Sequence, residues 1–225
     1  MKKKIIIYTG SYPYGKTTES FIGPELNVMS RYPNYDITVV PVVKDNCIRE
    51  IPKSITLDNS IVNCSLWYKL KAVLGIFKHR IIAEVWKERK DICSFTYFLM
   101  ALKYLYAINL VFFDVEEKGV SQERITFYAF WLSYAPVSFG IYKNMHPDNH
   151  HIFVSRGHRI EVYSTDLGVF YPMRDFLYQN IDRVYVCSEE GAMYLRNRYP
   201  YAADKITRAY LGVIENKREI ERSDS

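Results

Sequence analysis

His158 is the side chain whose type and position most directly point to chemistry. It follows a short apolar run, residues 152–154, which is typical of a buried strand. In parallel α/β sheets, ligands bind outside the carboxyl ends of the strands. An imidazole there can donate or accept a hydrogen bond and changes its charge near neutral pH. A histidine after a buried strand is also common as a structural polar residue, so the residue type alone leaves both roles open.

A second candidate site lies in the first loop. Residues 10–17 read Gly-Ser-Tyr-Pro-Tyr-Gly-Lys-Thr, which fits the phosphate-binding pattern GxxxxGK[ST] after a predicted strand. A loop of this kind binds phosphate through successive backbone N–H groups. Pro13 has no N–H, and Tyr12 and Tyr14 put large rings into the tightest part of the curve. The sequence therefore weighs against a P-loop NTPase, which stays the lesser alternative.

Metal sites and disulfides are not indicated. His146, His150 and His151 are close in sequence, but Pro147 prevents the first two from sharing a helical face. The four cysteines show no CxxC spacing, which favours free thiols in a reducing compartment. The apolar run after the N-terminal lysines is too short for a signal peptide, so we expect a cytoplasmic protein.

The elements that would position these residues alternate between strand and helix. Apolar runs predict strands at residues 5–8, 37–43, 110–113, 125–131 and 152–154, and helices are predicted at 18–31, 92–107 and 134–145. Pro41 suggests an edge position or a bulge in the second strand. This alternation predicts an α/β, Rossmann-like domain with a parallel central sheet flanked by helices.

Two regions together resemble the N-terminal domain of family-4 glycosyltransferases, the retaining enzymes of the two-domain GT-B fold. In residues 152–213 the resemblance is carried by Ser155-Arg156-Gly157-His158, by Val186-Cys187-Ser188-Glu189-Glu190-Gly191 and by a final strand, Leu211-Gly212-Val213. In the first loop it is carried by Tyr12-Pro13-Tyr14-Gly15 and Glu19-Ser20-Phe21. The resemblance covers most of the chain and is weakest in residues 47–113.

The resemblance implies a site with three kinds of residue. His158 would lie beside the transferring sugar as the catalytic candidate, hydrogen-bonding a hydroxyl without being the nucleophile. Relatives often follow this histidine with Gly and Asp, where this chain has Arg159 and Glu161. A charge at Glu19 is also what the first turn of any helix favours, and Gly15 is also typical of a simple turn. The implied acceptor-binding residues are Glu19, Arg156 and Glu161, and the implied donor-binding residues are Gly10 and Gly15.

The activity implied is that of a hexosyltransferase in polysaccharide biosynthesis. It would move a sugar, with retention, from a nucleotide sugar to a glycan or lipid-linked acceptor, without a metal or other cofactor. Residues 1–213 would form the N-terminal domain and 214–225 would begin the linker to a donor domain that the chain lacks. Such donor domains carry two glutamates eight positions apart, a spacing not found here. We therefore expect the chain alone to be inactive; a stand-alone carbohydrate-binding or regulatory module is the alternative.

Charge points to a further partner. The net charge is only +5, but residues 66–90 contain seven Lys or Arg against two Glu. Apolar residues at helical spacing in this segment predict either a basic helix on an anionic membrane or a helix that packs on the sheet. Residues 92–113 are apolar enough to suggest a membrane span, but the central Lys103 favours a buried helix. The 20 tyrosines form no aromatic-and-basic motif typical of nucleic-acid binding.

Overall fold

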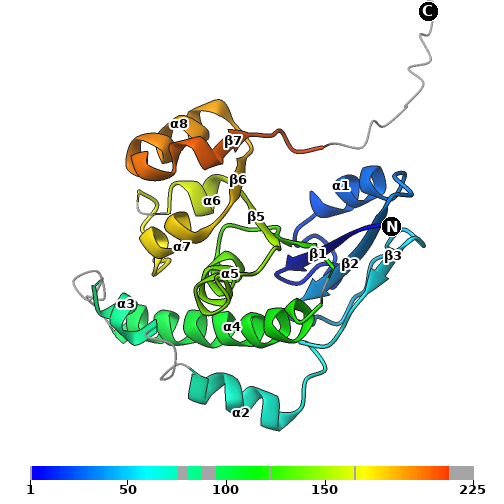
Figure 1. The fold of residues 1–225 in the computed structure, drawn as a ribbon, viewed down its shortest axis with the longest axis horizontal. Helices are drawn as coiled ribbons and strands as arrows, with labels where there is room; N and C mark the ends of the chain where they lie inside the picture. Colours follow the sequence, from blue (N-terminus) through cyan, green and yellow to red (C-terminus); the bar gives the residue numbers. More distant parts are fainter. Residues whose placement is uncertain (1, 76–80, 88–94, 122, 165, 213–225) are drawn as a thin grey trace, which may run out of the picture.

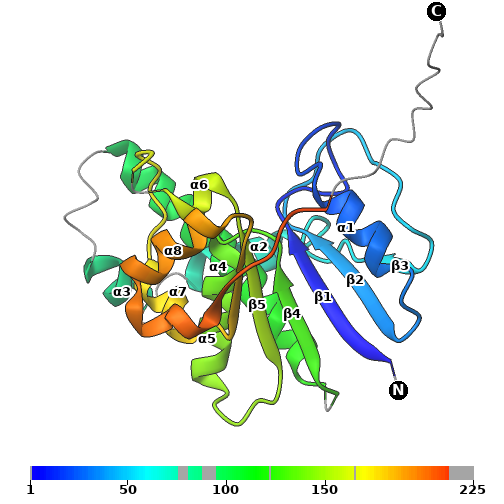
Figure 2. The same ribbon diagram turned by 90° about the horizontal axis from the view of Figure 1, so that it is seen from above.

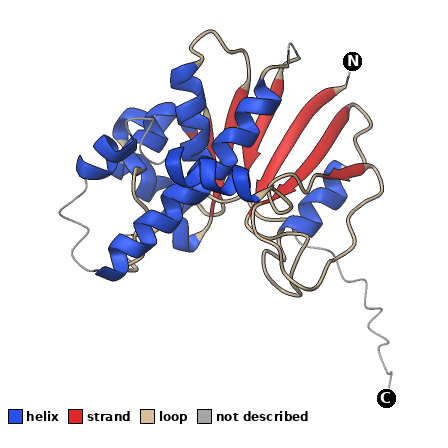
Figure 3. Cartoon of the chain, turned by 90° about the horizontal axis from the view of Figure 1, so that it is seen from below, coloured by secondary structure: helices blue, strands red, loops and turns tan. Residues whose placement is uncertain are grey.

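Within the described residues, seven parallel strands form one sheet in the order β3-β2-β1-β4-β5-β6-β7 (Figures 1 and 3). The strands are Lys3–Thr9 (β1), Tyr35–Pro41 (β2), Ile55–Leu57 (β3), Ile125–Ala129 (β4), Ile152–Gly157 (β5), Arg183–Val186 (β6) and Ile206–Arg208 (β7). This computed structural model describes residues 2–75, 81–87, 95–121, 123–164 and 166–212. The predicted Rossmann-like class with a parallel sheet is confirmed.

Helices cover both faces of the sheet. They are Ile22–Met29 (α1), Leu66–Gly75 (α2), Ile81–Lys87 (α3), Phe95–Gly119 (α4), Tyr134–Met145 (α5), Arg159–Val162 (α6), Arg174–Asn180 (α7) and Glu189–Arg198 (α8), with a 3-10 helix at Pro200–Lys205. Helices α4 and α5 pack together on one face, and α1 lies on the other (Figures 1 and 2). Helix α2 packs on the outer side of α4, away from the sheet.

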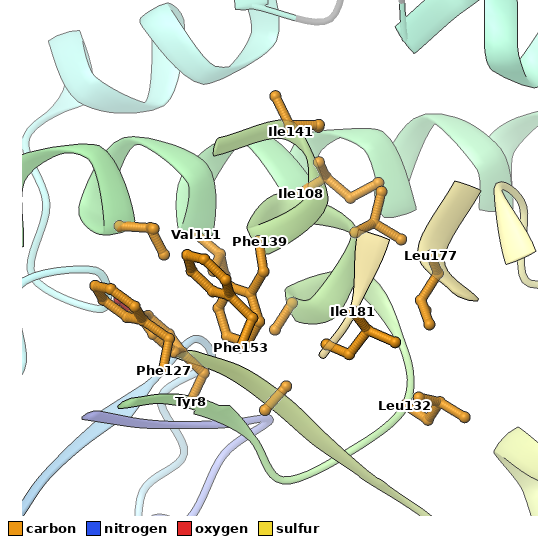
Figure 4. Packing of buried hydrophobic residues seen from close by; sticks show 14 of the residues in the cluster. Tyr8, Ile108, Val111, Phe127, Leu132, Phe139, Ile141, Phe153, Leu177 and Ile181 are labelled. Atoms are coloured by element: carbon orange, nitrogen blue, oxygen red, sulfur yellow. The ribbon is translucent and has the colours of Figure 1, made fainter. Parts of the chain in front are cut away.

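Alternation along the strands divides the core between these two faces. On β1, Ile6 and Tyr8 join the cluster under α4 and α5, whereas Ile7 joins the cluster under α1. The larger cluster is rich in aromatic rings: Phe127 and Phe153 stack with their centroids 5.5 Å apart (Figure 4). Burying one such side chain stabilises the fold by roughly 1.5–3 kcal/mol. Burial on both faces of the sheet therefore stabilises these strands, and they depend little on the intrinsic β-propensity of their residues.

Helix α4 corrects the prediction for residues 92–113. The predicted helix 92–107 followed by a strand at 110–113 is wrong, because one helix runs from Phe95 to Gly119; residues 92–94 lie outside the described part. Leu110, Val111, Phe112 and Phe113 are all buried, since the sheet and α5 cover one side of the helix and α2 the other. A short run that is apolar on every side is compatible with either element.

The same helix is long and apolar enough to cross a membrane, with a mean hydropathy of 1.6 in its most apolar window. However, 61% of that window is buried inside the protein. Its second half is also fixed by polar contacts: the Asp114 carboxylate accepts hydrogen bonds from the Tyr8 hydroxyl at 2.7 Å and the Ser60 hydroxyl at 2.8 Å, and it pairs with Lys118. In this structure α4 is a core helix of the domain.

Other predicted elements also change their bounds; the strand predicted at 125–131, for example, is Ile125–Ala129. The first helix is shorter than residues 18–31 and begins at Ile22, with Gly23 and Pro24 in its first turn as expected. Pro41 ends β2 beyond its pairing with β3, so it interrupts no ladder between those two strands. The last strand is Ile206–Arg208, so the prediction of a strand at 211–213 is wrong for the described residues Leu211 and Gly212.

Within the predicted helix 66–90, the structure describes two helices, α2 and α3. Helices α2 and α3 are separated by residues 76–80, which, like 88–90, lie outside the described part. The apolar residues of α2 do not pack on the sheet: Leu66 is 83% exposed, and Leu70, Val73 and Leu74 are exposed as well. For α2, the interpretation of its apolar stripe as core packing is wrong.

Candidate functional site

The candidate site lies where the sheet order reverses. Strands β1 and β4 are neighbours in the sheet but far apart in sequence. The strand that follows β1 lies on one side of this pair, and the strand that follows β4 lies on the other. Such a switch point at the carboxyl ends of the strands is where open α/β sheets bind ligands. Three segments meet here: the loop after β1, the residues after β4 from Phe130 to Ser133, and the end of β5 at His158.

His158 follows β5 directly and is half-buried. Its ring stacks on Phe21 with centroids 5.8 Å apart and meets the edge or face of Trp131 at 6.4 Å. Phe21 precedes α1 and Trp131 follows β4, so the ring joins all three segments of the edge. The structure places His158 at the carboxyl edge of the sheet, and its role in a site stays a prediction.

Glu161 lies beside this histidine. Its carboxylate accepts the backbone N–H of His158 at 3.1 Å, as a residue three positions into a helix commonly does. Burial raises the pKa of the Glu161 carboxyl, against the effects of the hydrogen bonds it accepts and of nearby His158 and Arg174. Arg174, which the sequence did not single out, donates to the Glu161 carbonyl at 2.6 Å and to the Leu132 carbonyl at 2.7 Å. It ties the end of β4 to α6.

Glu19 has a structural task that the sequence did not reveal. Its carboxylate accepts the backbone N–H groups of Gly10 at 2.7 Å, of Ser11 at 2.7 Å and of Tyr12 at 2.6 Å. It also accepts the indole N–H of Trp131. Successive N–H groups that converge in this way form an anion-binding nest, and here the anion is a side chain of the same chain. The carboxylate therefore fixes the loop after β1 to the end of β4.

The backbone at Glu19 shows what this contact requires. Its φ is +56°, a left-handed conformation that is uncommon for a residue with a side chain. Because Glu19 precedes α1, whose first turn holds Glu25, it does not act as the helix-terminal charge considered from sequence. An acceptor contact would use an oxygen that already has partners in this structure, so that role stays a prediction.

The glycines of the loop are likewise engaged. Gly15 has a φ of +84°, and a Cβ there would lie 2.3 Å from the Thr18 hydroxyl oxygen, so only glycine fits. Its N–H donates to the Cys47 carbonyl at 2.7 Å, while the N–H of Gly10 donates to Glu19. Gly15 is thus required by the turn itself, and the donor-binding role of both glycines stays a prediction.

The geometry of the first loop weighs against the P-loop interpretation. The N–H groups of Gly10, Ser11 and Tyr12 bind Glu19, that of Tyr14 binds the Ser11 carbonyl, and that of Gly15 binds Cys47. Pro13, which follows a cis peptide bond, has no N–H. From residue 10 to residue 15 no backbone donor is free for a phosphate, and α1 begins only at Ile22, six residues after Lys16.

Arg156 belongs to a buried network on the α1 face of the sheet. Its guanidinium donates to the Tyr128 hydroxyl at 3.0 Å and to the Ala209 carbonyl at 3.0 Å, and it lies 3.3 Å from a Glu25 carboxylate oxygen. Burial works against the charged form, but Tyr128 and Glu25 outweigh it, so the pKa of Arg156 is raised. These contacts hold the segment after β7 against α1 (Figure 2). Acceptor binding by Arg156 stays a prediction, in competition with these contacts.

The hollow at the switch point is small. A cavity of about 10 Å³ is lined by Tyr8, Thr9, Gly10, Trp131, Ser133, Tyr134 and Ala135; it has room for about one water molecule. Larger shallow hollows of about 390 and 440 Å³ lie around His146–His151 and around Thr38, Thr56 and Lys118. Among the described residues, no group of three or more His, Cys, Asp or Glu side chains is arranged to hold a metal ion.

Comparison with known proteins gives a similarity of fold and none of sequence family. No protein-family model matches the chain, and no curated protein matches it. Among solved structures, it is similar to UGT2 of Phytolacca americana, determined in complex with UDP-2fluoro-glucose and pterostilbene, with a TM-score of 0.47 and 9% sequence identity. The match covers 94% of this chain and 53% of that one, so the chain spans about half the length of that structure. At this level the similarity carries no conclusion about activity.

Proposed function

We propose that this domain is the acceptor-binding half of a retaining glycosyltransferase that uses a nucleotide sugar as donor. The observation that carries the proposal is the position of His158 at the carboxyl end of β5, beside the switch point and between two aromatic rings. Aromatic surface with a few convergent polar groups is typical of sites for small ligands. The sequence motifs around Gly15 and His158 supply the reaction class.

In this proposal His158 hydrogen-bonds a hydroxyl of the transferring sugar, and Glu161 holds the backbone at His158 and faces the acceptor. An imidazole suits this task because its neutral form can donate or accept a hydrogen bond and its charged form can donate one. Glu19 and Arg156 act mainly by fixing the two loops that border the acceptor. Gly10 and Gly15 give the first loop a flat backbone surface on the donor side, and no metal ion takes part.

The remaining parts of the proposal concern the whole protein. Residues 214–225 begin a linker to a donor-binding domain, and residues 1–213 alone do not catalyse transfer. The enzyme is of the hexosyltransferase type, acts in polysaccharide biosynthesis in the cytoplasm, and takes a glycan or lipid-linked acceptor. Contact between residues 66–90 and the inner face of an anionic membrane belongs to the same proposal.

The test is transfer by the full-length protein with a panel of nucleotide sugars and acceptors. His158→Ala should lower kcat/KM by about 10²-fold or more, because a contact that strengthens in the transition state is lost. His150→Ala, which changes an exposed histidine outside the site, is the matched control. Equal activity of the two variants would remove His158 from the site.

Analysis of the product tests whether transfer retains the configuration and whether the alternative function applies. The proton–proton coupling constant at the anomeric carbon of the first product should report the same configuration as in the donor; inversion would contradict the retaining class. Glycan binding by the full-length protein without transfer from any nucleotide sugar would instead indicate a carbohydrate-binding or regulatory module. A chelator should leave transfer unchanged.

A further inference from the structure

Helix α2 presents its apolar side to solvent. Its inner side carries Tyr68, Ala72 and Gly75, which contact α4: the Tyr68 hydroxyl donates to the Leu110 carbonyl at 3.2 Å, and a Cβ on Gly75 would lie 2.9 Å from the Asn109 side chain. At about 100° per residue, Leu70 lies almost opposite this side. Leu66, Trp67, Val73 and Leu74 surround Leu70, and Trp67 is 71% exposed.

Lysines border this apolar stripe on both sides. Lys69 and Lys71 are exposed and lie about 100° to either side of Leu70 around the helix. The Lys71 Nζ also lies 4.3 Å from the centroid of the Phe113 ring on α4. Helix α2 has no acidic residue. An apolar stripe with a basic side chain on each side is the pattern of a helix that lies in the plane of a membrane surface, since lysine stems can reach to headgroup phosphates.

Helix α4 continues the apolar surface. Phe95 and Leu102 lie on the same line of α4 as Asn109, at intervals of seven residues, and Gly75 at the end of α2 contacts this line at Asn109. Phe95 is 74% exposed, and Phe98, Leu99 and Leu102 beside it are exposed as well. The one charged residue of this half of the helix is the exposed Lys103. The exposed apolar residues in the N-terminal half of α4 therefore lie on the same side of α4 as helix α2.

We propose that the outer side of α2 and the N-terminal half of α4 together form a surface that docks on an anionic lipid membrane. Exposed apolar patches of this kind mark interaction sites. A lipid surface is favoured over a protein partner because all the charges of the described residues on it are positive, and basic side chains near a membrane are attracted by anionic headgroups. This docking surface does not depend on a membrane-spanning segment, because α4 stays packed in the domain.

The docking surface lies toward the same edge of the sheet as His158. Within α4, Tyr104 contacts Tyr134, which follows the end of β4, and Tyr171, which precedes α7. Tyr97 lies about two helical turns before Tyr104, toward the N-terminus of α4, and packs on Phe170. The start of α4 thus extends past the carboxyl ends of the strands. If the proposed transfer function holds, an acceptor carried on a lipid would reach the site from this surface.

Membrane docking is tested without any sugar substrate, so its failure is separate from failure of the proposed activity. Binding of the protein to vesicles of phosphatidylcholine, with and without phosphatidylglycerol, is measured by co-sedimentation. We expect binding that needs the anionic lipid and declines with salt, because the screening length falls from about 8–10 Å near physiological ionic strength to about 3 Å at 1 M.

Two variants with matched controls assign the surface. Lys69→Gln with Lys71→Gln should weaken vesicle binding by about 30-fold. Each lysine near an anionic membrane contributes about 1 kcal/mol, and about 1.4 kcal/mol corresponds to a tenfold change in affinity. Lys44→Gln with Lys53→Gln removes the same charge from exposed sites elsewhere. Leu70→Ser with Leu74→Ser should weaken binding at least about tenfold, whereas Val28→Ser with Met193→Ser, at exposed positions outside the surface, should not.

Fluorescence of Trp67 gives an independent result. Its emission should shift to the blue on vesicle binding, and lipids brominated in their tails should quench it; Trp67→Phe isolates its signal from those of the other tryptophans. Binding that ignores lipid charge, or equal effects of variants and controls, would overturn the proposal. So would a concentration-dependent dimer that Leu70→Ser with Leu74→Ser abolishes, since the surface would then join two copies of the chain.

Discussion

The two ends of β5 carry histidines in opposite situations. His151, just before the strand, is 7% exposed, and both ring nitrogens have backbone partners: Nδ1 accepts from the Ile125 N–H at 3.2 Å, and Nε2 lies 3.0 Å from the Gly119 carbonyl. His158, just after the strand, is half-buried and meets two aromatic rings. The same residue type on one strand thus serves the fold at one end and faces a candidate site at the other.

This comparison shows that nearness to a strand end does not decide function by itself. Arg156 is only two residues from His158, yet its guanidinium already contacts Tyr128, Ala209 and Glu25 of the same chain. Side chains alternate between the two faces along a strand, so Arg156 points to the α1 face with Val154. A polar group whose hydrogen-bonding capacity is already used by the protein has little left for a ligand.

The largest effect on stability is expected at Arg156. Arg156→Met should lower the free energy of unfolding by about 3 kcal/mol or more, because it leaves the Glu25 carboxylate without its cationic partner and the Ala209 and Tyr210 carbonyls without their donor. Chemical denaturation, compared with Arg124→Met at an exposed position, measures the loss. A variant as stable as that control would mean that the network is incidental, and Arg156 would return to the acceptor-binding candidates.

An intermediate effect is expected at His151. His151→Ala should cost about 2 kcal/mol, because it leaves a buried N–H and a buried carbonyl unpaired. Burial lowers the pKa of His151, and a charged ring would lose the hydrogen bond from Ile125. The folded protein therefore binds this proton less readily than the unfolded chain, so its stability is full above about pH 6.5 and is lost as the pH falls toward the folded pKa.

Stability curves between mildly acid and neutral pH check this sign. The loss of stability on acidification should be smaller in His151→Ala than in the unchanged protein, and His150→Ala, at the exposed neighbouring position, should leave the profile unaltered. If acidification destabilised His151→Ala as much as the unchanged protein, a group other than His151 would be responsible for the pH dependence.

The smallest effect on stability is expected at His158. His158→Ala should change the free energy of unfolding by less than about 1 kcal/mol, because a half-buried ring with two aromatic contacts contributes little beyond its partial burial. Thermal denaturation beside His151→Ala is the direct comparison. A loss as large as that at His151 would place both histidines in the structural class, and the site would need another reactive group.

The fold could be predicted largely because its strands are short apolar runs between helices, a pattern that permits few arrangements. The position of His158 at a carboxyl edge followed from the same alternation. The second half of α4 could not be predicted, since Leu110–Phe113 are buried on every side and show no periodicity that separates a helix from a strand. The direction of the apolar stripe on α2 was also open, because periodicity gives a face but not its partner.

The structural tasks of Glu19 and Arg156 depend on contacts that are distant in sequence. Glu19 reaches Trp131 across 112 residues, and Arg156 reaches Ala209 across 53. The nest around Glu19 further requires a positive φ at a non-glycine residue, which no local pattern announces. Motif similarity thus pointed to two segments that meet at the switch point, whereas the use of each carboxylate and guanidinium required three-dimensional contacts.

The bond between Trp131 and Glu19 makes the first loop observable in solution. The chain has three tryptophans, so its nitrogen–proton correlation spectrum should contain three indole signals. The Trp131 N–H is held by a carboxylate and is partly buried, whereas the Trp67 side chain is largely open to water. The Trp131 signal should therefore exchange its proton more slowly, and any molecule that pulls Glu19 out of the loop would move that one resonance.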